Sequence, residues 1–73
     1  MERPLDALNA AKGQQVIVQL KNKSQITGTL KSFDIHINLV LGNAEQNNEE
    51  NKTTKLNEIF IRGDMVVFVS PKE

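Results

Sequence analysis

Two segments near the end of the chain are apolar at almost every position, and they restrict the fold more than any other feature. The segments are residues 59–61 and 66–69. Successive side chains of a β-strand point to opposite faces, so a strand without polar alternation has to bury both faces. A chain of 73 residues has too few other residues to cover both faces of two such strands. We therefore expect a neighbouring copy of the chain to pair with their edges.

Composition leaves few other sources of stability. The chain has no cysteine, which excludes disulfides, thiolate metal sites and a cysteine nucleophile. Nine Lys and Arg balance nine Asp and Glu, so a role in nucleic-acid binding has to rest on a local site. No apolar run is long enough to span a membrane, and the first four residues lack the apolar core of a signal peptide. We expect a cytoplasmic protein with no membrane partner.

The pattern predicts a single domain over residues 1–73 that begins with a short helix and a β-hairpin. Pro4 suits the first turn of a helix, and apolar residues at helical spacing predict a helix over 4–12. Alternating residues predict two strands joined by a polar turn at 21–24. Gly28, inside the second strand, indicates a bend or bulge, with a merely tolerated glycine as the alternative.

Three further strands complete the prediction. The third ends at residue 41 and is followed by a polar segment, 43–55, which we expect to be a solvated loop. Its glutamates lack the spacing of a calcium loop, so no metal site is predicted. The fourth strand begins at residue 56, and residues 63–64 form a hairpin turn with positive φ before the fifth. The fold class is all-β: a strongly bent, five-stranded antiparallel sheet, or small open barrel.

A polar strip at the start of the third strand is the main candidate for a functional site. Asp34, His36 and Asn38 are spaced two apart, so they share one face of a strand. An imidazole can stack on a base, an Asn amide can read a base edge, and a carboxylate can orient neighbouring donors. Arg62, beside the turn at 63–64, offers a second flat surface and a positive charge. The residue types alone leave open a solvated strand face beside an ordinary turn.

Catalytic and metal-binding roles find little support. His36 is the only histidine, and without cysteine it cannot anchor a recognisable zinc site. A hydrolase pair would join it to one of three serines, but none is accompanied by a nucleophile elbow or an oxyanion loop. We therefore predict no enzyme activity and no cofactor.

Two stretches resemble the two motifs of Sm and Sm-like (LSm) proteins. Residues 28–41, GTLKSFDIHINLVL, resemble the first Sm motif, which we place at 13–46. Residues 59–66, IFIRGDMV, resemble the second, which we place at 56–70 with the variable polar loop at 43–55 between them. The compact chain is similar to the archaeal Sm-like type.

The resemblance implies an N-terminal helix on a bent five-stranded sheet, and a ring in which strand four of one subunit pairs with strand five of the next. The archaeal type favours a homo-oligomeric ring of seven. Such rings bind single-stranded, U-rich RNA near the central pore, in RNA processing or ribonucleoprotein assembly. Other RNA-processing proteins are further candidate partners. The alternative is a protein-assembly scaffold ring with little or no RNA specificity.

The resemblance also assigns roles by motif position. His36 and Arg62 would sandwich a base, and Asn38 would read the edge of that base. Asp34, Gly63 and Asp64 would support the pocket.

Overall fold

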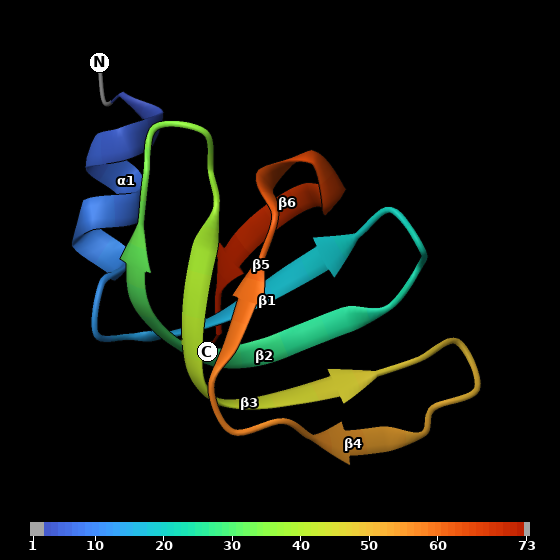
Figure 1. Cartoon of the computed structure of the whole chain (residues 1–73). Coiled ribbons are helices and arrows are strands. Elements are labelled where there is room, and N and C mark those ends of the chain that lie inside the picture. Colours follow the sequence, from blue (N-terminus) through green and yellow to red (C-terminus); the bar gives the residue numbers. More distant parts are fainter. Residues whose placement is uncertain (1–2, 73) are drawn as a thin grey trace.

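A strongly bent antiparallel sheet with one short helix beside it makes up the computed structural model, which describes residues 3–72 (Figure 1). The elements, in chain order, are α1 (Pro4–Ala11), β1 (Gln15–Leu20), β2 (Gln25–Phe33), β3 (Leu39–Asn47), β4 (Thr53–Lys55), β5 (Ile59–Ile61), the 3-10 turn η1 (Gly63–Met65) and β6 (Val66–Pro71). The predicted fold class is confirmed. The sheet has six strands and not five, because the predicted fourth strand is shortened to β5 and the additional strand β4 precedes it. In the described part of the chain, no helix has the length and apolar character needed to cross a membrane.

The long strand β3 carries two partners in succession along one edge. The strand order is β4-β3-β2-β1-β6, and β5 pairs with the first half of β3 while β4 pairs with the second half. Between these partners, the Ala44 N–H donates to Asn57 O at 2.8 Å, and the Leu56 N–H donates to Ala44 O at 2.8 Å. The chain thus stays attached to β3 while it passes from β4 to β5, as Figure 1 shows.

Gly28 lies where the sheet bends. The register between β2 and β3 shifts between Thr27 and Thr29. A Cβ atom on Gly28 would lie 2.9 Å from the Gly42 carbonyl oxygen, which is closer than a Cβ approaches a backbone atom, and a tight 3.2 Å from Ala44 Cα. The two strands can approach this closely only because residue 28 has no side chain. The bend is therefore confirmed over the merely tolerated glycine.

The core lies inside the curve of the sheet. Its buried apolar side chains come from the four strands β1, β2, β3 and β5: Val16, Val18, Leu20, Ile26, Leu30, Leu39, Leu41, Ala44 and Ile61. Burying one such side chain stabilises the fold by about 1.5–3 kcal/mol. The helix α1 contributes no fully buried residue and packs against this core through Leu8 and Ala11, which are partly buried.

The polar segment predicted as a solvated loop over 43–55 is largely a hairpin, so that prediction is wrong outside the turn at 48–52. Glu45, Gln46 and Asn47 on β3 pair with Lys55, Thr54 and Thr53 on β4. This pairing uses backbone N–H and C=O groups, which every residue type carries, and leaves the polar side chains in contact with water. An apolar pattern is therefore not needed to form these strands.

The hairpin predicted around residues 63–64 is also wrong. Gly63 begins the 3-10 turn η1 and does not adopt positive φ. The strands on either side of it do not pair with each other, because β5 pairs with β3 and β6 pairs with β1. Each of the two apolar strands therefore pairs with a different strand that contributes to the core.

The edges of β5 and β6 explain why residues 59–61 and 66–69 are apolar at almost every position. Within residues 3–72, β5 pairs only with β3 and β6 only with β1, so each strand has one unpaired edge. Phe60 on β5 is 78% exposed, and Val67 and Phe68 on β6 are 59% and 48% exposed. A single copy of the chain leaves these apolar edges uncovered.

Replacing Gly28 with Ala should lower the free energy of unfolding by about 1–3 kcal/mol, because the added methyl group presses on the backbone of β3. Urea unfolding at matched protein concentration measures this loss. Thr29→Ala, at the next residue, is the control and should cost less than about 1 kcal/mol. Equal losses from both substitutions would mean that the close approach at Gly28 does not constrain the fold.

Candidate nucleic-acid interface

A tight turn between β2 and β3 holds three of the six predicted site residues. The Asp34 N–H donates to Asn38 O at 3.2 Å, and the Ile37 N–H donates to Asp34 O at 3.1 Å. Ile37 adopts positive φ, 63°. Asp34, His36 and Asn38 therefore do not alternate along a strand as predicted; the chain has turned back on itself between residues 34 and 38, and the turn brings them together.

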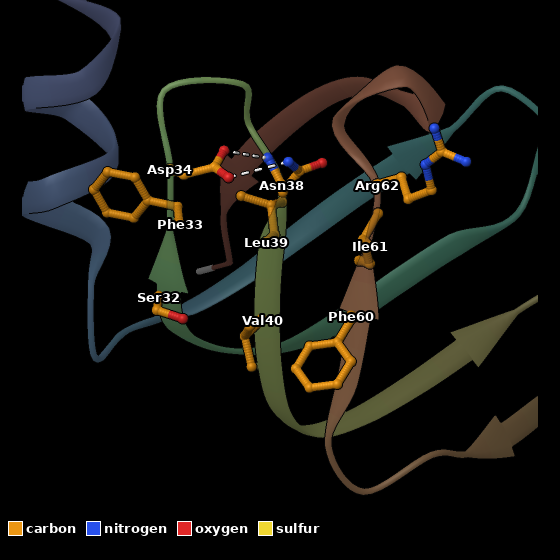
Figure 2. A pocket seen from close by; sticks show the side chains of 9 residues that line it. All are labelled: Ser32, Phe33, Asp34, Asn38, Leu39, Val40, Phe60, Ile61 and Arg62. Atoms are coloured by element: carbon orange, nitrogen blue, oxygen red, sulfur yellow. Dashed lines mark hydrogen bonds between the residues drawn. The ribbon is translucent and has the colours of Figure 1, made fainter.

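The Asp34 carboxylate organises this turn. One oxygen, Oδ1, accepts hydrogen bonds from the backbone N–H groups of His36 at 2.8 Å and Asn38 at 3.1 Å. The other oxygen, Oδ2, accepts a hydrogen bond from Asn38 Nδ2 at 3.0 Å. Figure 2 shows the amide nitrogen of Asn38 facing Asp34 and its oxygen turned away. An Asp that binds the N–H two residues ahead is a common way to stabilise a turn.

The Asn38 amide links the turn to a distant part of the chain. Its Oδ1 accepts a hydrogen bond from the backbone N–H of Gly63 at 2.7 Å. A Cβ atom on Gly63 would collide with the carbonyl oxygen of His36, so only glycine lets the two backbones lie this close. The glycine is thus required by close approach and not by the positive φ that the sequence predicted.

The remaining site residues lie around an open pocket. His36, Asn38, Arg62, Gly63 and Asp64 line a hollow of about 460 Å³. Arg62 Nη2 lies 3.3 Å from Asp64 Oδ2, and the two side chains are 83% and 62% exposed. An ion pair this exposed holds the guanidinium only weakly, so Arg62 can change partners. The structure brings five of the predicted residues to one pocket. The sixth, Asp34, does not line this pocket but accepts a hydrogen bond from Asn38, which does.

A second hollow, of about 440 Å³, adjoins this pocket along β3 and β5 (Figure 2). Asn38 and Arg62 line both hollows, and Val40 and Phe60, which pair across β3 and β5, line the second. The sequence analysis assigned no binding role to Val40 or Phe60. The signal was available, because Val40 falls between the core residues Leu39 and Leu41 and so points outward.

The chemistry of this site suits a flat, polar ligand. A guanidinium and an imidazole offer flat faces, and the Asn38 amide offers hydrogen bonds at the edge of the pocket. Across residues 3–72, no three His, Cys, Asp or Glu side chains gather where they could hold a metal ion. The arrangement therefore favours stacking and hydrogen bonding.

The hydrogen bonds around Asp34 lower the pKa of its carboxyl group below the ordinary value. The largest cause is the bond from Asn38 Nδ2, desolvation opposes the shift, and the backbone N–H groups of His36 and Asn38 add to it. Each of these bonds favours the ionised carboxylate. The charge of Asp34 therefore stabilises the turn at neutral pH.

A family model and the relatives found by sequence comparison agree with one another. The family model described as LSM domain matches residues 6–71. The Sm-like protein of Methanosarcina barkeri is 52% identical over 69 residues, which cover 94% of this chain and 96% of that protein. The Sm-like protein of Pyrococcus furiosus is 42% identical over 72 residues, which cover 99% and 95%.

Solved structures agree with the sequence relatives. The Sm protein of Pyrococcus abyssi, solved in complex with a uridine heptamer, superposes with a TM-score of 0.91 at 38% identity over 97% of this chain and 100% of that chain. A heptameric archaeal Sm protein superposes with a TM-score of 0.86 at 37% identity over 92% and 97%.

Acidification should release the Asn38 side chain from Asp34. Because the pKa of folded Asp34 is lowered, its stabilising contribution is complete above the unfolded pKa and is lost as the pH falls through the folded value. The NMR signals of the Asn38 side-chain amide, followed during an acid titration, should report a midpoint below the ordinary Asp range. Asp34→Asn should abolish this transition, and a midpoint at or above the ordinary range would contradict the assigned hydrogen bonds.

Proposed function

Since this chain belongs to the Sm-like (LSM domain) family, we propose that it forms a homo-oligomeric ring that binds single-stranded, U-rich RNA near its pore. The observation that carries the proposal is the convergence of residues from two distant motifs. Asn38 and Gly63 are joined by a 2.7 Å hydrogen bond, and His36 and Arg62 line the same pocket. A solved relative binds a uridine heptamer, which supports the ligand class.

In this proposal one base lies in each pocket. His36 and Arg62 stack on its two faces, and Asn38 forms hydrogen bonds with its edge. Asp34 and Gly63 hold Asn38 in place, as their hydrogen bonds support. Asp64 supports the pocket by pairing with Arg62 until RNA binds. The exposed guanidinium can then turn from this carboxylate toward a base or a phosphate.

The ring forms, in this account, by pairing the free edge of β5 in one copy with the free edge of β6 in the next. This contact extends the sheet from subunit to subunit and covers Phe60, Val67 and Phe68. A head-to-tail contact of this kind generates a ring when its rotation closes. The heptameric archaeal relative supports a ring of seven identical subunits.

Repetition of the pocket supplies the affinity. Stacking one base contributes about 1–3 kcal/mol, which is too little for tight binding by one subunit. Once one nucleotide is bound, its neighbours in the strand meet further pockets at a high effective concentration. A chain with no net charge can thus bind RNA, because each pocket contributes its own arginine.

The proposed role is RNA binding without catalysis, in cytoplasmic RNA processing or ribonucleoprotein assembly, with other RNA-processing proteins as further partners. The side chains of the pocket favour this role, since they provide stacking surfaces and hydrogen bonds without a nucleophile paired to a base.

Phe60→Glu should convert the ring to smaller species, because it places a charge on an edge strand that would otherwise be covered. The subunit should stay folded, since Phe60 is 78% exposed in a single copy. Native mass spectrometry and circular dichroism measure the two properties. Ile35→Glu is the matched control: Ile35 is 72% exposed but lies outside β5 and β6, so its ring should stay intact. An intact ring of Phe60→Glu would contradict pairing at this edge.

Arg62→Ala should weaken the binding of oligouridine by about tenfold or more, through loss of one stacking face in every pocket. The ring should persist, because Arg62 lies outside β5 and β6. Fluorescence anisotropy with a labelled oligomer measures the affinity. Lys55→Ala removes the same charge from the exposed strand β4 and should change binding much less.

Equal effects of Arg62→Ala and Lys55→Ala would contradict the proposed pocket and leave only a general attraction by charge. A wild-type ring that binds neither oligouridine nor oligocytidine would instead be a protein-assembly scaffold.

A further inference from the structure

We propose that Ile37 positions the RNA pocket, the hollow lined by His36, Asn38 and Arg62, by anchoring its turn in a separate apolar hollow between α1 and β6. The inference rests on the proposed function and concerns a residue that does not line the RNA pocket. Ile37 acts through His36 and Asn38, its two neighbours in the chain, and is therefore a positioning residue.

Ile37 has a backbone conformation that its residue type disfavours. Its φ of 63° lies in the left-handed region, where the Cβ atom crowds the following carbonyl group. Branching at Cβ adds to this crowding, so isoleucine is rare in the left-handed region, whereas glycine and asparagine enter it readily. A residue in such a conformation persists only where the surrounding structure holds it. A contact of Ile37 has to supply that hold.

A second turn in the same chain shows that the turn itself does not require isoleucine. In turns 34–38 and 48–52 alike, the first N–H donates to the fifth carbonyl oxygen, and the fourth N–H donates to the first. The side-chain Oδ1 of the first residue accepts from the third and fifth N–H groups in both. The fourth residue has φ 63° in both turns, and it is Ile37 in one and Asn51 in the other. Asparagine suits that backbone, so the isoleucine serves a purpose outside the turn.

The side chain of Ile37 lies on an apolar hollow of about 430 Å³ between α1 and β6, which we call the α1–β6 hollow. Leu8 and Ala11 of α1 and Val66 and Val69 of β6 also line it. All five side chains are partly buried and pack against the core. Removing the Ile37 side chain from water here offsets the cost of its left-handed backbone. An asparagine would gain nothing from this apolar contact.

The backbone of residues 36–38 lies between the α1–β6 hollow and the RNA pocket. His36 and Asn38 line the RNA pocket, while Ile37 between them lines the hollow. Gly63 lines both, and a Cβ atom on it would lie 3.1 Å from the Ile37 carbonyl carbon. A displaced Ile37 would therefore disturb the backbone against Gly63 and the 2.7 Å hydrogen bond from Gly63 to Asn38. The placement of the pocket thus depends on the anchor at Ile37.

The experiment replaces Ile37 with Asn, which suits the left-handed backbone but lacks the apolar anchor. The variant ring should bind oligouridine about tenfold or more weakly, because every pocket loses its fixed placement. Ile35→Asn is the matched control: it makes the same change in the same turn at a residue that is 72% exposed, and should bind within about twofold of wild type. Ile37→Leu keeps an apolar side chain of equal size and should retain wild-type binding.

Hydrogen exchange separates positioning from a general effect on stability. The backbone N–H groups of His36 and Asn38 donate to Asp34 at 2.8 and 3.1 Å, so their exchange reports opening of the turn. In the RNA-free ring of Ile37→Asn these two groups should exchange about tenfold or more faster than in wild type. The corresponding groups of turn 48–52 should exchange at the wild-type rate. Native mass spectrometry checks that the ring is intact.

Ile37→Ala also removes the anchor, and it decides the question if Ile37→Asn does not assemble. Wild-type affinity for oligouridine in the variant without the anchor, or wild-type exchange in turn 34–38, would overturn the inference. Equal losses of affinity in Ile37→Asn and Ile35→Asn would overturn it as well. The exchange measurement needs no RNA, so it tests the anchor independently. The proposed function fails separately, if the wild-type ring does not bind oligouridine.

Discussion

The unpaired edges of β5 and β6 are the constraint on which the rest of this structure depends. Both strands are apolar on successive residues, and in a single copy each is paired along one edge only. The two strands do not pair with each other, because β5 pairs with β3 and β6 pairs with β1. Joining the edge of one copy to that of the next satisfies their hydrogen bonds and covers Phe60. The strand order that builds the subunit therefore also leaves the two edges that a neighbouring copy can cover.

The candidate site depends on the same arrangement. The turn 34–38 ends β2 and begins β3, while Arg62 and Gly63 follow β5, which pairs with β3. Pairing of Leu39 with Ile61 thus brings the two motifs together, and the bond from Gly63 to Asn38 completes the contact. A ring built through β5 and β6 would repeat this pocket at regular intervals. Weak stacking at one pocket would then become tight binding of a strand.

Much of the fold follows from residue patterns, and the rest depends on contacts that patterns do not record. Pro4, the alternation in β1 and Gly28 predicted the helix, the first hairpin and the bend, because each has a local cause. The strand β4 was missed because backbone pairing does not require apolar side chains. The six site residues were predicted from residue types and family motifs. The resemblance implied that they share one pocket, but the hydrogen bond between Asn38 and Gly63 was not predicted, since it exists only after β5 has paired with β3.

The central claim is that a single copy is incomplete and that assembly creates useful RNA binding. Native mass spectrometry of the wild-type protein over a dilution series, with and without oligouridine, tests it most directly. The account predicts one closed ring of identical subunits, with oligouridine bound to the ring and not to smaller species. A stable monomer that binds oligouridine as tightly as the undiluted protein would contradict it.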